Sequence, residues 1–388
     1  MPDVLVTIGA YTWSGWKEVT ITAGIEQAAR TFEIAITERP GDYSATAGAG
    51  SLTLADQDRV LETADAGDRV FVRPGDAVQI DYGGERILTG FVNEFTRSLS
   101  AHDHTVRIAG RSKTQDLIDC SAEWGGGQML HVSTADLARN LCAPFGLEVV
   151  ANETDTLMAA VPFMQVNLGE SVTDMIDRSA RMSGFLVTDD AYGRLVLTRA
   201  SRARTSAGYN EGQNVEIAAV SATDVDRFSV YKSFGASRVQ VRGESPYKVL
   251  ATRTDAAVRR RRVKIAIADG AADFQALLER RLDWELNRRI GRATVISLTV
   301  DSWQVQMQGA AQPSLIEPNT LVPISLPTLG IAGPLLWLVG AVTYRFGADG
   351  THADLTLMSP KAFAPEPMAI QAPLKDSSAP GGVFGAGR

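Results

Sequence analysis

A pattern of one turn and three strands occurs twice in this chain of 388 residues, and it constrains the fold more than any other feature. The first copy covers residues 74–108 and the second covers 318–357. Each copy opens on a polar turn, continues through two strands with an inner glycine (Gly90 or Gly340), and ends on a third strand. A repeated supersecondary unit predicts a duplicated structure, and small barrels leave no open sheet edges. We expect two similar antiparallel β-barrels, although an unrelated pair of β-meanders would produce the same pattern.

The middle of the chain changes from a strand pattern to a helix pattern. Ser133 or Thr134 can begin a helix that ends near Gly146, because a hydroxyl side chain satisfies free backbone N–H groups. Ser171 can begin a second helix that ends at Gly184. A hairpin follows, so this segment predicts a small α+β domain.

A long helix is expected from Ala271 to Ile290, with Gly291 ending it, followed by a β-branched strand at 294–300. The chain is rich in Pro, Ala, Gly and Ser from Pro360 onward. The predicted fold class is therefore mainly β with an α+β part. The predicted domains are a first tube-like barrel at 1–112, an α+β domain at 113–204, a second barrel at 205–243 and 292–360, an insertion with the long helix at 244–291, and a disordered tail at 361–388.

Composition excludes several classes of protein. Apolar residues make up 45% and charged residues 21%, as in ordinary globular proteins, and the net charge of −7 argues against a general nucleic-acid binder. The N-terminus lacks the pattern of a signal peptide, and the apolar stretch 331–342 is too short and broken to span a bilayer. We expect synthesis in the cytoplasm, and we expect Cys120 and Cys142 to be buried, reduced thiols.

The sequence contains no recognisable catalytic or metal-binding motif. No G-x-S-x-G, H-E-x-x-H or Walker loop occurs, and His102 and His104 have no third ligand nearby. Gly125–Gly127 is expected to be a tight turn, and Asp116 and Asp119 lie in a helix-compatible segment without a partner groove. We therefore predict no catalytic residue, no metal and no cofactor, and a protein that is not an enzyme.

Four consecutive arginines form the strongest charge feature: Arg259, Arg260, Arg261 and Arg262. Three interpretations stay open. The run can be a nucleic-acid patch, a solvated segment paired with Glu279, Asp283 and Glu285, or a charged subunit interface or basic wall facing a DNA channel.

Four stretches, read together, resemble the baseplate hub protein of Mu-like contractile-tailed phages. These stretches are Trp13-Ser14-Gly15-Trp16 with the strands that follow it, 110–122 with 126–128, 137–146, and 193–200. The second stretch is the most specific. Its residues that match the family motif, as structural or interface candidates, are Gly110, Arg111, Asp116, Asp119, Gly126, Gly127 and Gln128.

The resemblance implies a structural role in the tail baseplate of a virion assembled in the host cytoplasm. It implies a homotrimer whose six barrels form a pseudo-sixfold ring between the tail tube protein and the central spike protein, in contact with other baseplate proteins. DNA would only pass through the channel, and the chain would not insert into a membrane. The alternatives are a tail-associated enzyme with a cell-wall-degrading domain, and a DNA- or tube-binding adaptor that uses the arginine run.

Overall fold

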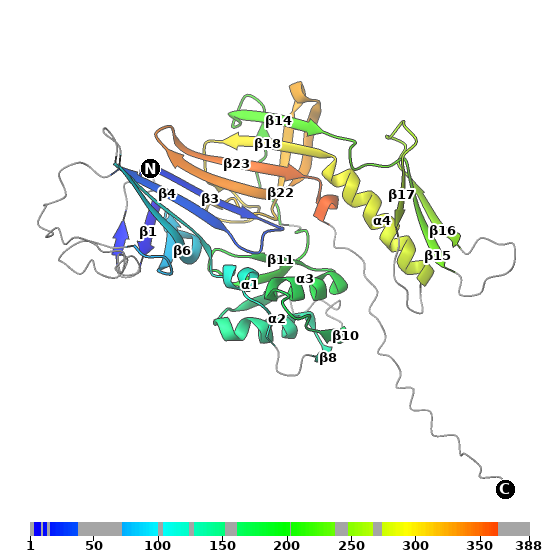
Figure 1. The fold of residues 1–388 in the computed structure, drawn as a ribbon. Coiled ribbons are helices and arrows are strands. Elements are labelled where there is room, and N and C mark those ends of the chain that lie inside the picture. Colours follow the sequence, from blue (N-terminus) through cyan, green and yellow to red (C-terminus); the bar gives the residue numbers. More distant parts are fainter. Residues whose placement is uncertain are drawn as a thin grey trace, which may run out of the picture.

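The computed structural model describes residues 4–8, 11–13, 16–37, 72–99, 104–123, 128–151, 161–201, 203–236, 247–266 and 274–363. These residues form a large curved sheet, an α+β domain below it and a smaller helix-and-sheet unit at one end (Figure 1). The fold is mainly β with an α+β part, as predicted.

The N-terminal part of the large sheet contains seven strands. They are β1 (Val4–Ile8), β2 (Tyr11–Trp13), β3 (Glu18–Gly24), β4 (Thr31–Thr37), β5 (Ala77–Tyr82), β6 (Glu85–Leu99) and β7 (His104–Ser112). The strands β1, β3 and β5 alternate between buried and more exposed residues, the pattern of a sheet with one face on a core.

The C-terminal part adds six strands to the same sheet. They are β13 (Tyr209–Asn210), β14 (Ile217–Ala222), β18 (Thr294–Val300), β21 (Leu321–Leu326), β22 (Ile331–Gly347) and β23 (Gly350–Met358). The main strand order is β14-β18-β23-β22-β3-β4-β7-β6-β5-β1-β2, with β21 beside β22 and β13 beside β21. The two repeats therefore share one 13-stranded sheet, joined where β22 pairs with β3. A short hairpin of β19 (Gln304–Val305) and β20 (Ser314–Leu315) lies beside it.

One hydrophobic core underlies both parts of this sheet. Trp303 is completely buried at its centre, and its ring lies 4.5 Å from that of Tyr82 and 5.3 Å from that of Tyr344. Such ring pairs add about 0.5–1.5 kcal/mol each beyond the area they bury. Tyr82 belongs to the first repeat and Tyr344 to the second, so Trp303 ties the two repeats together.

The α+β domain has its own core, in which Leu137 and Ile176 are fully buried. Ser133 accepts a hydrogen bond from Asp136 N, and Ser171 caps the next helix in the same way. Gly184 closes that helix in the left-handed conformation, so the predicted helix ends are confirmed. The elements are α1 (Gln115–Asp119), β8 (Gln128–Val132), α2 (Thr134–Cys142), η2 (Ala143–Phe145), β9 (Val149–Ala151), β10 (Val161–Gln165), α3 (Val172–Ser183), β11 (Leu186–Asp189) and β12 (Leu195–Thr198).

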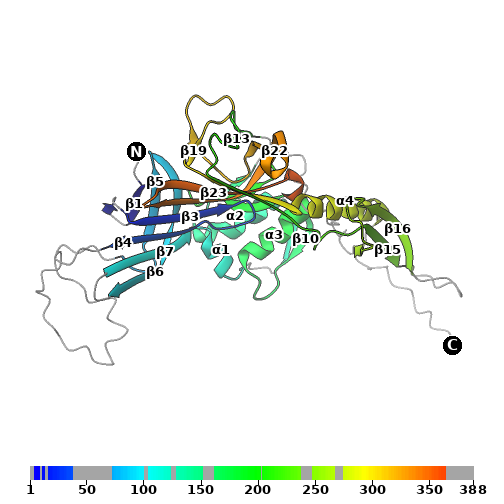
Figure 2. The same cartoon turned by 90° about the horizontal axis from the view of Figure 1, so that it is seen from above.

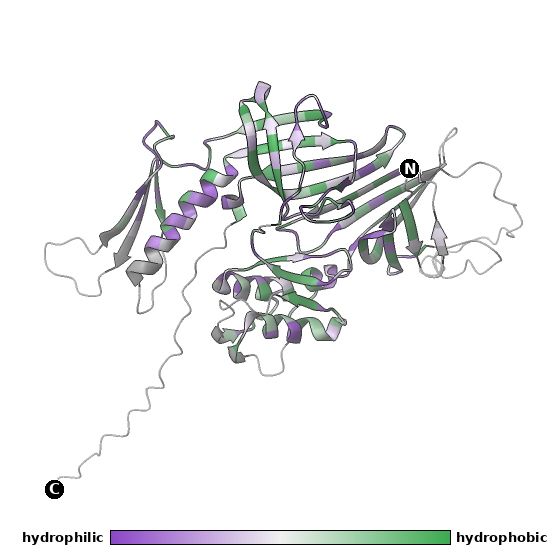
Figure 3. Ribbon diagram, turned by 180° about the vertical axis from the view of Figure 1, so that it is seen from behind, coloured by the Kyte–Doolittle hydropathy of each residue, from purple (hydrophilic) through white to green (hydrophobic). Residues whose placement is uncertain are grey.

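A separate unit projects from one end of the large sheet (Figure 2). It contains β15 (Val230–Ala236), β16 (Tyr247–Thr254), β17 (Val263–Ala266) and α4 (Phe274–Arg292). We expected the second barrel to extend to residue 243. Instead β15 pairs with β16 and β17, because this local sheet can bury Tyr231 against Leu282 of the helix. The helix α4 shows mainly hydrophilic colours in Figure 3, whereas the large sheet carries many hydrophobic residues.

The end of the predicted long helix and the start of the predicted disordered tail differ from expectation. Gly291 lies inside the last turn of α4, where a Cβ would come within 2.4 Å of Ala362 N, so glycine permits a close approach and does not end the helix. The predicted disorder at 361–388 is wrong for its first residues. The short helix η4 (Pro360–Phe363) buries Ala362 and Phe363, and 364–388 lie outside the described residues. No helix in the described ranges is long and apolar enough to cross a membrane.

Candidate functional site

The two sequence repeats form the same backbone structure. Gly75 and Asn319 open the two copies with φ of 96° and 68°, the left-handed region. The Gly75 N–H donates to Val92 O at 2.7 Å, and the Asn319 N–H donates to Val339 O at 2.8 Å. Each acceptor residue is followed by a β-bulge, in β6 and in β22. Two tertiary features repeated at matching positions make the duplication a property of the fold.

The bulges also correct the predicted alignment of the copies. Because Val92 matches Val339, Gly340 matches Asn93, three residues away from the predicted match with Gly90. The two glycines serve different close approaches. A Cβ on Gly90 would lie 2.0 Å from Arg111 O, and one on Gly340 would lie 2.8 Å from the Phe363 ring.

The copies meet along a seam, which we define as Val19–Gly24 of β3 paired with Ala341–Phe346 of β22. The pairing is antiparallel and continuous over six residue pairs. Thr22 and Thr343 lie opposite each other, and their hydroxyl oxygens are 3.1 Å apart. Cross-strand hydroxyl pairs of this kind contribute about 0.2–1 kcal/mol and favour one register. The seam gives the chain two similar units in a fixed order along one sheet.

An ionic joint, in which Arg30 and Asp189 are buried and Glu317 is partly exposed, connects both parts of the large sheet to the α+β domain. Its members are Arg30 in the turn before β4, Asp189 at the end of β11, and Glu317 before β21. The Arg30 guanidinium donates to Glu317 at 3.1 and 2.6 Å and to Ile87 O at 3.0 Å. The Arg30 backbone N–H donates to Asp189 Oδ2 at 2.9 Å, and Arg30 Nε lies 3.4 Å from Asp189 Oδ1. One arginine therefore links the N-terminal part of the large sheet, its C-terminal part and the α+β domain.

Burial determines the protonation of this joint. Burial raises the pKa of Asp189 to about 6, although Arg30 and the Ser112 hydroxyl act in the opposite direction. Burial alone would lower the pKa of Arg30, but Glu317 and Asp189 beside it hold that pKa above its ordinary value, so the guanidinium stays charged. These residues were not identified from the sequence. Arg30 and Glu317 are 287 positions apart in the chain and come together only in the folded structure.

The residues chosen from the family motif lie at the start of the α+β domain. Gly110 of β7 has no room for a side chain, since a Cβ would lie 2.1 Å from Phe91 O. Arg111 and Asp119 form an ion pair, and Asp116 lies in the first turn of α1. These contacts anchor α1 to the sheet. Gln128 begins β8, and Gly126 and Gly127 lie outside the described residues.

The arginine run lies before β17 and is only partly engaged. Arg260 pairs with Asp224 at 2.7 Å, and Arg262 donates to two backbone carbonyls while it stacks on Phe228. Arg259 and Arg261 are exposed. The run is thus a partly paired segment, and a role in binding stays a prediction.

Two acidic residues of α4 also have arginine partners. Asp283 accepts from Arg253 at 2.7 Å and Glu285 accepts from Arg289 at 2.7 Å. Asp283 and Glu285 are therefore bound by arginines that lie outside the run 259–262.

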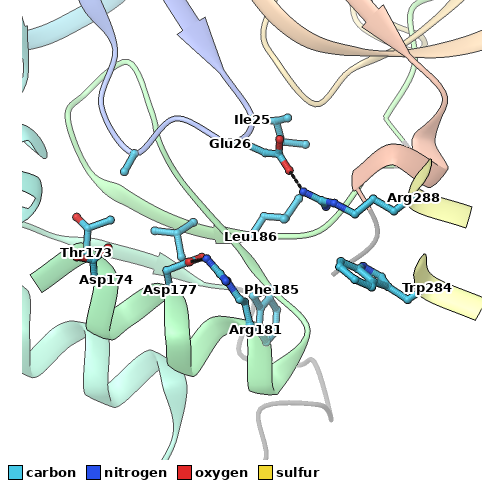
Figure 4. Close-up of a pocket in the computed structure, with 12 residues that line it drawn as sticks. Ile25, Glu26, Thr173, Asp174, Asp177, Arg181, Phe185, Leu186, Trp284 and Arg288 are labelled. Atoms are coloured by element: carbon cyan, nitrogen blue, oxygen red, sulfur yellow. Dashed lines mark hydrogen bonds and ion pairs between the residues drawn. The ribbon is translucent and has the colours of Figure 1, made fainter. Parts of the chain in front are cut away.

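A cavity of about 380 Å³ lies where the β3–β4 turn, α3 and α4 meet (Figure 4). Its acids Glu26 and Asp177 are paired with Arg288 and Arg181, the first at 2.8 Å. The first pair joins α4 to the β3–β4 turn, and the second lies within α3. Within the described ranges no group of three or more His, Cys, Asp or Glu residues is placed to hold a metal ion.

The two cysteines differ in environment. Cys142 is buried, and burial raises its pKa to about 12, whereas Cys120 is exposed. The expectation of two buried thiols was therefore wrong for Cys120, which follows the short helix α1 at the domain edge.

Comparison with known proteins defines the class of protein. Residues 3–112 match the family described as Mu phage baseplate assembly protein GpP-like, N-terminal. Residues 114–199 match Baseplate hub protein gp44-like, second domain, and 275–366 match Mu phage baseplate assembly protein GpP, fourth domain. The two repeats and the domain between them are thus those of a phage baseplate protein.

The chain belongs to the family of the baseplate hub protein gp44 of Escherichia phage Mu. It is 30% identical to that protein over 363 residues, which is 90% of this chain and 86% of the relative. The crystal structure of the prophage MuSo2 43 kDa tail protein from Shewanella oneidensis matches with a TM-score of 0.77 at 25% identity, over 93% of this chain and 99% of that one. The tail protein from Neisseria meningitidis MC58 has the same fold, with a TM-score of 0.72 at 18% identity over 95% and 99% of the chains.

Proposed function

We propose that three copies of this chain form a ring in the baseplate of a contractile tail, as a structural hub between the tail tube and the central spike. The observation that carries the proposal is the seam, which places two equivalent strand units side by side in one sheet. Three chains with two barrel-like units each would present six similar units, and a duplicated chain can adapt a sixfold tube to a threefold spike.

The proposed partners are the tail tube protein, the central spike protein and other baseplate proteins, in a virion assembled in the host cytoplasm. DNA would pass through the central channel without being bound. The net charge of −7 supports this, because a wall without strong basic charge does not retain the phosphate backbone.

The role would be structural and not enzymatic. Strand pairing, shape and buried contacts are sufficient for a ring of this kind, and the ionisable groups of the buried joint are paired with each other. A zymogram on peptidoglycan would test the enzyme alternative. A clear zone produced by the purified chain would contradict the structural role.

Light scattering of the purified protein tests the ring directly. We expect a mass three times that of the 41.6 kDa chain, and negatively stained images of rings with six similar lobes. A monomer that persists at the highest soluble concentration, with no rings in the images, would overturn the proposal.

A further inference from the structure

The pairing registers identify equivalent strands in the N-terminal and C-terminal parts of the large sheet. Phe32 of β4 lies opposite Gly110 of β7, and Ile296 of β18 lies opposite Leu357 of β23. Gly110 and Leu357 are themselves matched, because each pairs with the valine before the bulge of its copy. The strand β18 is therefore the equivalent of β4.

The same reasoning extends to the outermost strand. Ile21 of β3 lies opposite Phe32, and Val220 of β14 lies opposite Ile296. The strand β14 is therefore the equivalent of β3, with Ser221 in the position of Thr22. In the same way the second half of β6 is the equivalent of the seam half of β22, with Thr96 in the position of Thr343.

Among the described residues, these two equivalents lie at positions of the sheet that have a paired strand on one side only. Within the described part of the chain, β14 pairs with β18 alone, and Glu94–Leu99 of β6 pair with β7 alone. Ile217 of β14 is 66% exposed, and Thr96 and Ser221 are both exposed. Each of these edges is thus equivalent to one strand of the seam, but the strand that would pair with it is not present among the described residues of the same chain.

We propose that the second half of β6 in one copy pairs with β14 of a second copy, in the register of the seam. Thr96 then lies opposite the partner's Ser221, and Phe95 lies opposite the partner's Ala222, as Val342 lies opposite Ala23. This pairing rests on the proposed ring. A contact between two different edges is head-to-tail, and head-to-tail contacts build a closed ring only when the rotations from copy to copy add up to a full turn.

The chemistry of the two edges agrees with this register. Thr22 and Thr343 hold the seam with a hydroxyl contact of 3.1 Å, and their equivalents Ser221 and Thr96 again carry hydroxyl groups. The register also places the small Ala222 opposite the large Phe95 on the core-facing side, where Phe95 packs against the main core. A shift by one residue would turn the hydroxyl pair away from each other, because side chains alternate between the two faces.

Engineered disulfides test the register. The variant Thr96→Cys/Ser221→Cys, made with Cys120→Ser to remove the exposed thiol, is oxidised and run on a non-reducing gel. We expect covalent trimers of the 41.6 kDa chain. Six strands separate β14 from β6 in the sheet, so this bond forms between chains.

Two controls accompany this variant. Thr22→Cys/Thr343→Cys should form the same bond within one chain and migrate as a monomer. Thr96→Cys with Ala219→Cys, two residues out of register, should give little cross-linking.

The outcomes separate the two proposals. The protein can be a trimer in light scattering while Thr96→Cys/Ser221→Cys fails to cross-link and Thr22→Cys/Thr343→Cys forms its bond within one chain. That outcome overturns the register and leaves the ring intact. Preferential cross-linking of the out-of-register pair also overturns the register. A chain that is only monomeric overturns the ring, and the strand pairing fails with it.

Discussion

Replacement of Arg30 by methionine should destabilise the protein more than removal of any surface arginine. The change keeps an unbranched side chain of similar length but deletes the charge that Asp189 and Glu317 share. The side chains of Arg30 and Asp189 are only 4% and 2% exposed, so the remaining aspartate is left as an uncompensated buried charge. Breaking a buried ion pair on one side costs about 3–5 kcal/mol, and we expect a loss in this range.

The matched control is Arg107→Met. Arg107 pairs with Glu33 at 2.7 Å, a good distance, but the two side chains are 57% and 49% exposed. Solvent screens such a pair, so its loss should cost between about 0 and 1 kcal/mol. Both variants are unfolded with urea at pH 8 and followed by tryptophan fluorescence, because Asp189 with a pKa of about 6 is ionised there.

The double variant Arg30→Met/Asp189→Asn makes the test specific. It removes the stranded charge, so it should be more stable than the sum of the two single losses predicts. Equal losses for Arg30→Met and Arg107→Met, or strict additivity in the double variant, would refute the view that a buried ionic joint holds the three parts together.

Three further variants test single contacts. Because the folded-state pKa of Asp189 is raised to about 6, the contribution of this residue to stability is present below about pH 4 and is lost as the pH rises through 6. The difference in unfolding free energy between the wild type and Asp189→Asn should therefore fall by roughly 3 kcal/mol over that window, as measured by thermal or urea unfolding. Gly110→Ala should cost about 1–3 kcal/mol in the same assay, whereas Gly347→Ala, with open space around its Cβ, should cost under about 0.5 kcal/mol, and equal costs would contradict the packing argument. Asn319→Gly keeps the left-handed turn but loses the side-chain hydrogen bonds to Ser201 N, Arg199 O and Thr198 Oγ1 at 2.7, 2.8 and 3.2 Å, so it should cost about 1–3 kcal/mol in the same assay. Asn319→Ala should cost about 1 kcal/mol more than Asn319→Gly, because alanine is strained at a φ of 68°, and a more stable alanine variant would contradict this conformation.

Structural features that depend on residues close together in the chain could be predicted from the sequence. Helix ends at Ser133, Ser171 and Gly184 follow from hydrogen bonding within four residues. The repeated strand pattern was also visible, because alternation has a period of two and needs no distant partner. The bulge positions were not visible, since a bulge depends on both strands, and the copies were aligned three residues out of register.

Contacts between distant segments were decided only by the tertiary structure. The assignment of β15 to the small sheet, the close approach of Gly291 to Ala362, and the burial of Phe363 each depend on which surfaces meet after folding. The same holds for the seam and for the joint of Arg30, Asp189 and Glu317, whose members carry no local signal. The sequence by itself determined two similar β units and a helical domain between them, because those follow from short-range periodicity. Only the fold determined how the units are joined, because long-range pairing depends on shape and on burial of charges far apart in the chain.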